Sequence, residues 1–283
     1  MANSPAAATL CVVSKTIGRV AMLKHCIVGV DYSPEWDRTL EYLPAIKSLV
    51  GLEHLTLVHV VESFKRKRGQ DETGVAEGHL KGLAEQLTAD LGITVDYQVR
   101  TGFAASEILE AAKKHQADGV IALNRSHSAS REVLIGNIVV NLARMTKLPL
   151  LVVASDGAIA EPGAPVILGT DGSGPAKSAQ HWFEGFVRRG NHGLALWVDA
   201  DEHDDEEEAH RTLSALSSTF SNVATRRLKG DVTDELVRTA GEEKAALLII
   251  GKRGSTPIQD LLLGSTAEAV VRESRQPVLL IPA

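Results

Sequence analysis

Short apolar runs alternate with longer stretches of helical period along most of the chain. In its carboxy-terminal part the apolar runs predict strands near residues 165–170, 193–198, 222–228, 246–250 and 277–281. The stretches between them predict helices near residues 174–189, 206–220, 231–244 and 265–275. Runs such as residues 246–250 are apolar at every position, which is typical of strands covered on both faces of a sheet. The alternation predicts a doubly wound parallel α/β sheet.

The same order of elements occurs twice, because the sequence repeats itself. Residues 27–33 (IVGVDYS) recur as residues 167–173 (ILGTDGS), 140 positions later. The runs at 57–60 and 148–153 recur at 195–198 and 276–281. Internal repetition on this scale indicates a duplicated domain.

The repeat sets the expected domain boundaries. Two tandem α/β domains are predicted at residues 23–154 and 165–283, joined by a linker at 155–164. Residues 1–22 are expected to lie outside the fold, either as a disordered tail or because the true start is Met22. Their short apolar run lacks the basic start and the cleavage pattern of a signal peptide.

Three glycines after the fourth strand of the second copy carry the best candidate chemistry. Gly251, Gly254 and Gly264 are spaced as Gly-x2-Gly-x9-Gly, and Ser265 and Thr266 follow. Ligands of open α/β sheets bind beyond the carboxyl ends of the strands, near the change in strand order. We expect Gly251 to be a glycine because a Cβ there would crowd a ligand. The helix that opens after Gly264 offers its amides and dipole to an anion such as phosphate.

With this motif the chain resembles the tandem form of the universal stress protein family, whose nucleotide-binding members carry the same glycine pattern. The resemblance spans residues 24–283 and implies two Rossmann-like, adenine-nucleotide α-hydrolase-like domains. It implies that Asp171 contacts the nucleoside of a bound ATP, with or without Mg²⁺, and that Val198 contacts the adenine. The residues implied to hold the nucleotide are Gly169, Thr170, Asp171, Val198, Gly251, Arg253, Gly254, Ser255, Gly264, Ser265 and Thr266.

Purely structural alternatives stay open for these residues. Asp171 could cap the helix that follows Ser173, and the glycine loop could be an ordinary turn. The first copy departs from the motif, since Leu123 and Ser126 occupy the positions of Gly251 and Gly254. A branched side chain at Leu123 would fill the point of closest approach, so we expect the first copy to have lost ordinary ATP binding.

Composition narrows the class of protein. The chain has 283 residues, 44% of them apolar, with a formal charge of −6, so it has no overall attraction to nucleic acid or anionic membranes. No apolar run reaches the ~20 residues that a membrane-spanning helix needs. Its two cysteines cannot build a disulfide framework, which favours a reducing, cytoplasmic location. The basic run at 65–68 and the acidic run at 199–208 are expected to be solvated surface segments, and a metal site in the acidic run is the alternative.

These observations favour a binding protein: an ATP-binding regulator or interaction module of the stress response, with a protein partner that the sequence does not name. One alternative is an adenylate-forming or ATP-hydrolysing enzyme of the same superfamily, although neither the Ser-Gly-Gly-x-Asp-Ser type of loop nor the His-x-Gly-His signature usual in such enzymes occurs. A second is an interaction protein that binds no nucleotide. The last strands, at 148–154 and 277–281, would be open apolar edges, so we expect them to pair within one chain as a pseudo-dimer. A homodimer of whole chains is a further possibility.

Overall fold

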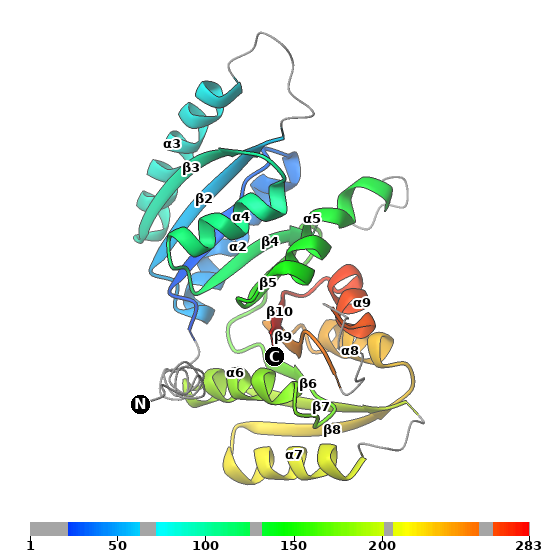
Figure 1. Cartoon of the computed structure of the whole chain (residues 1–283). Coiled ribbons are helices and arrows are strands. Elements are labelled where there is room, and N and C mark those ends of the chain that lie inside the picture. The colour runs from blue at the N-terminus through cyan, green and yellow to red at the C-terminus, as the bar shows by residue number, and fades with distance from the viewer. Residues whose placement is uncertain (1–21, 63–71, 125–131, 201–205, 255–262, 283) are drawn as a thin grey trace, which may run out of the picture.

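The computed structural model describes residues 22–62, 72–124, 132–200, 206–254 and 263–282, which form α-helices around one sheet (Figure 1). The first half runs β1 (His25–Gly29), α2 (Pro34–Val50), β2 (His54–Val61), α3 (Glu72–Leu91), β3 (Thr94–Thr101), α4 (Ala104–Lys114), β4 (Gly119–Asn124), α5 (Glu132–Met145) and β5 (Leu150–Ala154). The second half runs β6 (Val166–Gly169), α6 (Ala176–Arg188), β7 (Gly193–Asp199), α7 (Glu206–Thr219), β8 (Val223–Lys229), α8 (Val232–Glu242), β9 (Leu247–Gly251), α9 (Ser265–Glu273) and β10 (Val278–Ile281). Every element predicted for the second half lies within two residues of its observed bounds.

The strands form one ten-stranded sheet in the order β3-β2-β1-β4-β5-β10-β9-β6-β7-β8. Neighbouring strands within each half are parallel, which confirms the predicted doubly wound α/β architecture. The halves meet where β5 and β10 pair antiparallel, with Leu151 opposite Leu279, at the centre of Figure 1. The expected pairing of the two last strands is therefore present.

Helices cover both faces of the sheet, which explains the continuous apolar runs. One face packs against α2, α3, α6 and α7, and the other against α4, α5, α8 and α9. Successive strand residues alternate between these two cores, as Leu279 and Leu280 of β10 do. The edge strands β3 and β8 are more exposed, and β8 carries arginines that discourage edge-to-edge pairing.

The connection between the halves lies at residues 155–165, between β5 and β6, and contains no helix or strand. It begins inside the fold, because Ser155 is buried and its amide donates to the Asn124 carbonyl at 2.9 Å. Cys26 is fully buried in β1, where burial raises the pKa of its thiol. No helix in the described ranges is long and apolar enough to cross a lipid bilayer. Residues 1–21, which include most of the expected tail, lie outside the described part of the chain.

Candidate functional site

The candidate site lies at the carboxyl ends of β6 and β9, which are neighbours in the sheet. Ile167 pairs with Leu248, and the strand order changes direction between these two strands. Asp171 follows β6 by two residues, and Gly251 is the last residue of β9. The fold therefore brings the two candidate segments to the place where open α/β sheets bind ligands.

The Asp171 carboxylate connects the first strand to the glycine loop. Its Oδ1 accepts a hydrogen bond from the Ser173 amide at 2.9 Å, which fixes the turn after β6. Its Oδ2 faces Gly254, and a Cβ added to residue 254 would lie 2.7 Å from that oxygen. Because α6 begins at Ala176 with Pro175 as its N-cap, Asp171 holds the turn after β6, and its contact with a nucleoside stays a prediction.

Gly251 is required by the backbone of the protein itself. A Cβ at residue 251 would lie 2.9 Å from the carbonyl oxygen of Arg253 and 3.6 Å from that of Pro175. Backbone atoms of the loop and of the start of α6 therefore crowd this position already, and the expected approach of a ligand stays a prediction. The loop can fold back on itself only because residue 251 has no side chain.

Gly264 differs from the other two glycines. It is the N-cap of α9, and its amide donates to the Lys252 carbonyl at 3.0 Å. Its φ of −71° and ψ of 150° suit any residue, and a Cβ there would make only ordinary contacts, the nearest at 3.5 Å. Among the described residues, neither packing nor backbone conformation demands a glycine at position 264. The next residue, Ser265, is exposed at the first position of that helix.

The remaining predicted residues divide into two groups. Gly169 serves packing, because a Cβ there would lie 3.0 Å from both Ile250 and Leu236. The Thr170 hydroxyl accepts a hydrogen bond from the Gly172 amide at 3.1 Å and so supports the same turn.

The second group lies at or beyond the carboxyl ends of the strands. Val198 stands level with Asp171, since each lies two residues beyond the paired residues Leu196 and Gly169. Arg253 is half-buried within the loop, and Thr266 is half-buried in the first turn of α9. Ser255 lies outside the described residues.

The first half keeps the turn but changes its surroundings. Asp31 Oδ1 accepts from the Ser33 amide at 3.0 Å, the same bond that Asp171 makes. Leu123, the counterpart of Gly251, is partly buried near the end of β4. Ser126 lies outside the described residues.

Sequence reasoning missed Tyr32 in this half. It occupies the place of Gly172 and shares its left-handed backbone, with φ values of 52° and 75° respectively. Its hydroxyl donates to the Ala76 carbonyl of α3 at 3.0 Å, and its ring centroid lies 4.7 Å from that of His59. Burial raises the pKa of Tyr32 to about 12. The signal available in the sequence was a tyrosine where the second copy has a glycine.

Comparison with known proteins identifies the family. The sequence profile of the universal stress protein family matches residues 22–154 and again residues 165–282. The chain belongs to the universal stress protein family. Both halves match, so it has the tandem form that the sequence predicted.

Relatives of full length support this assignment. A universal stress protein of Mycolicibacterium smegmatis is 26% identical, over 90% of this chain and 96% of its own length. One from Mycobacterium tuberculosis is 25% identical, over 90% of this chain and 95% of its own length. The crystal structure of a universal stress protein from Archaeoglobus fulgidus has the same fold, with a TM-score of 0.77, 20% identity, and coverage of 93% of this chain and 98% of that one.

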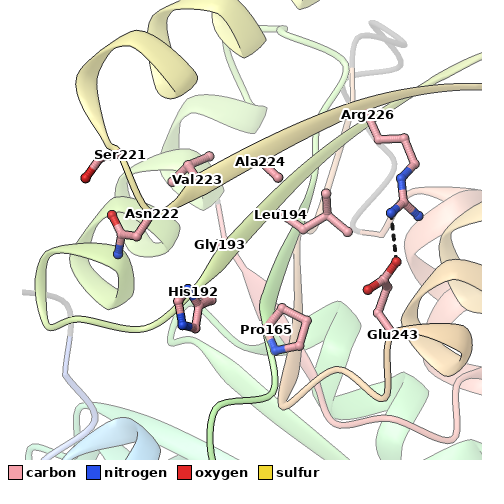
Figure 2. Close-up of a pocket in the computed structure, with 10 residues that line it drawn as sticks. All are labelled: Pro165, His192, Gly193, Leu194, Ser221, Asn222, Val223, Ala224, Arg226 and Glu243. Carbon is pink, nitrogen blue, oxygen red and sulfur yellow. Dashed lines mark hydrogen bonds and ion pairs between the residues drawn. The ribbon is translucent and has the colours of Figure 1, made fainter.

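A separate hollow of about 480 Å³ lies at the opposite, amino-terminal edge of this universal stress protein's sheet (Figure 2). Pro165 and His192 line it, and an ion pair of 2.7 Å between Arg226 and Glu243 closes one side. It lies at the starts of β6, β7 and β8, so it is distinct from the glycine loop.

The first half places imidazoles at the corresponding edge. His25 and His54 stack with ring centroids 3.8 Å apart, and His115 lies edge-on to His25 at 6.3 Å. The His25 side chain also bonds to the Thr56 hydroxyl at 2.9 Å. Burial, followed by His54 and His115, lowers the pKa of His25.

The acidic run is paired with arginines at both ends. Arg227 contacts Asp199 at 3.1 Å and Glu206 at 2.8 Å, and Arg211 contacts Glu208 at 3.1 Å. Among the residues that the structure describes, no group of three metal-binding side chains is suited to a metal ion. The middle of this run and the basic run at 65–68 lie outside the described residues.

Proposed function

We propose that this universal stress protein binds one ATP per chain, at the carboxyl ends of β6 and β9 in its second half. The observation that carries the proposal is the approach of Asp171 to Gly254, which places a carboxylate against the glycine loop at the change in strand order. A carboxylate there can accept hydrogen bonds from ribose hydroxyls, as acids do in other nucleotide-binding α/β folds. Val198, level with Asp171, would contact the base.

The phosphates would lie between the loop and the start of α9. The first amides of a helix have no partner within the helix and carry the positive end of its dipole, which favours an anion. Gly264 would keep the approach open, and Ser265 is exposed at the helix start. Arg253 would add positive charge from the loop. A Mg²⁺ ion would be carried by the phosphates, which supply ligands of the oxygen type it prefers.

The first half is not proposed to bind ATP. Tyr32 replaces a glycine in the turn after β1 and reaches α3, and Leu123 replaces the glycine at the end of β4. Both changes add side-chain volume where the second half has none. This half would then serve as a scaffold for the site in its partner half.

The proposed activity is binding rather than rapid turnover, in a regulator or interaction module of the stress response. The Asp171 carboxylate already accepts the Ser173 amide at 2.9 Å, so it holds the turn after β6. Regulation would follow from whether the site is filled, and the partner that detects this state is a protein.

Calorimetric titration of the full chain tests the proposal. ATP with Mg²⁺ should bind at one equivalent, and GTP should bind at least tenfold more weakly, because the apolar side chain of Val198 would contact adenine. If the titration shows no heat of binding with ATP at millimolar concentration, the site is refuted. Two equivalents of ATP would refute the assignment of the first half.

A further inference from the structure

Lys252 lies inside the glycine loop, yet its side chain reaches the other half of the protein. The residue is buried, with 8% of its surface exposed. Its Nζ donates to the carbonyl oxygens of Arg144 at 2.8 Å and Thr146 at 2.9 Å. These carbonyls belong to the end of α5 in the first half, where a cation also complements the helix dipole.

The backbone of Lys252 belongs to the candidate nucleotide site. Its carbonyl accepts the Gly264 amide at 3.0 Å, and its amide donates to the Ile281 carbonyl at 2.7 Å. One residue therefore joins β9, the start of α9, β10 and the end of α5. Burial, and to a lesser extent Arg253, lowers the pKa of Lys252 to about 8, so the ammonium form prevails at neutral pH.

A second contact joins the same two places. Glu268, in the first turn of α9, accepts from Arg144 at 2.8 Å and from Arg272 at 2.8 Å. Burial raises the pKa of Glu268, but the hydrogen bonds from the two arginines outweigh it and lower the pKa. Arg144 thus contacts both parts of the candidate site. Its carbonyl accepts a hydrogen bond from Lys252 of the loop, and its guanidinium donates to Glu268 of α9.

The other half supplies a symmetric counterpart. Asn124 occupies the position of Lys252 in the first copy, and its side-chain amide donates to the Val271 carbonyl at 2.8 Å, at the end of α9. Each half thus places a donor from the end of its fourth strand on the last helix of the other. Only Lys252 makes this contact from within a complete glycine motif.

We propose that Lys252 is a positioning residue that fixes the Gly251–Gly254 loop against the end of α5, so that nucleotide binding in the second half is coupled to its packing on the first. This rests on the proposed ATP site. Coupling is reciprocal, so ATP that stabilises the loop must also stabilise the end of α5. The first half would then regulate the site without binding nucleotide itself.

The matched variants Lys252→Met and Asn124→Leu test this in the full chain. Each keeps the length or shape of the side chain and removes one cross-half donor. Calorimetry should show that Lys252→Met weakens ATP binding roughly tenfold, equivalent to ~1.4 kcal/mol, while Asn124→Leu changes it less than about twofold. If Lys252→Met does not fold, Lys252→Gln, which keeps a donor without the charge, replaces it.

Amide hydrogen exchange supplies a readout that a merely structural bond would not change. In the wild type, ATP should slow exchange both in the loop and at the end of α5. In Lys252→Met, ATP should slow exchange in the loop but no longer at the end of α5. In Asn124→Leu, ATP should slow exchange in both regions. If ATP protects the end of α5 equally in Lys252→Met, or its affinity is unchanged, the coupling is refuted. Without ATP, Lys252→Met should still speed exchange in residues 251–254. That result separates a failure of this inference from a failure of ATP binding.

Discussion

The carboxylate of Asp171 and the backbone of Gly254 approach so closely that a Cβ on residue 254 would lie 2.7 Å from Asp171 Oδ2. The two residues are 83 positions apart in the sequence and follow neighbouring parallel strands. This contact joins the acid of the first strand to the glycine loop of the fourth. It makes specific predictions about which glycines the protein needs and which the ligand needs.

Gly254→Ala should reduce ATP affinity at least tenfold, about 1.4 kcal/mol, because the new methyl group must displace the Asp171 carboxylate. Calorimetry on the full chain measures this. Gly241→Ala is the matched control, since a Cβ at this position in α8 meets nothing within 4 Å. It should leave affinity unchanged and raise stability by up to about 1 kcal/mol through helix propensity. Equal affinity in both variants would show that Asp171 and Gly254 do not act together on the nucleotide.

Gly264→Ala and Gly251→Leu should separate ligand contact from loop folding. At residue 264 a Cβ makes ordinary contacts, so Gly264→Ala should keep the wild-type melting temperature and weaken ATP binding. At residue 251 a Cβ meets the Arg253 carbonyl at 2.9 Å, so Gly251→Leu should lose both affinity and stability. Thermal unfolding with and without ATP gives both quantities. Wild-type affinity in Gly264→Ala would mean that the phosphates do not approach the start of α9.

Acid should destabilise the first half through its stacked imidazoles. His25 has a lowered pKa in the folded state, so the unfolded chain binds its proton more readily. Its contribution to stability is complete above the ordinary histidine pKa of ~6.5 and is lost as the pH falls below that value. Urea unfolding at pH 7.5 and pH 5.5 should show a smaller acid-induced loss in His25→Gln than in the wild type. The same loss in both proteins would exclude His25 as a source of the pH dependence.

Cleavage between the halves should leave them associated. Residues 158–163 lie in the connection and are mostly exposed, so a protease site can replace them in the folded chain. The β5–β10 ladder, the buried leucines beside it and the bond of Lys252 to α5 should hold the fragments together. Size-exclusion chromatography at micromolar concentration should show co-elution. Separate elution without denaturant would show that the shared sheet does not join the halves.

The sequence predicts the second half well because periodicity follows burial. Strands covered on both faces are apolar throughout, and the helices between them show one apolar stripe. The bounds of both can therefore be predicted from the sequence. The glycine spacing likewise indicates the site, because turns that bring backbone close to backbone exclude side chains. For Gly251 the structure adds a reason that the sequence does not supply, since the Arg253 carbonyl oxygen lies against its Cα, while the expected approach of a ligand stays a prediction.

The pairing of β5 with β10 was predicted from the sequence, but the side-chain contacts between the halves could not be. The sequence pattern predicted no role for Lys252, although it donates to carbonyls 108 and 106 positions away. Every residue has a backbone carbonyl, so the sequence does not indicate which carbonyls will accept a hydrogen bond. The position of α5 follows only from the assembled ten-stranded sheet. Tyr32 was missed for a different reason: its left-handed backbone is rare for a bulky residue, so local propensity argues against it.

The most direct test compares Asp171→Ala with Asp31→Ala in titrations of the full chain with ATP. Each aspartate accepts the amide of the serine two residues on, at 2.9 Å and 3.0 Å, so the two variants lose the same turn contact. They differ in that only Asp171 faces a glycine loop. The account predicts that Asp171→Ala loses at least tenfold in ATP affinity while Asp31→Ala binds one equivalent with wild-type affinity. Unchanged binding in Asp171→Ala, or an equal loss in both, would contradict a nucleotide site in the second half.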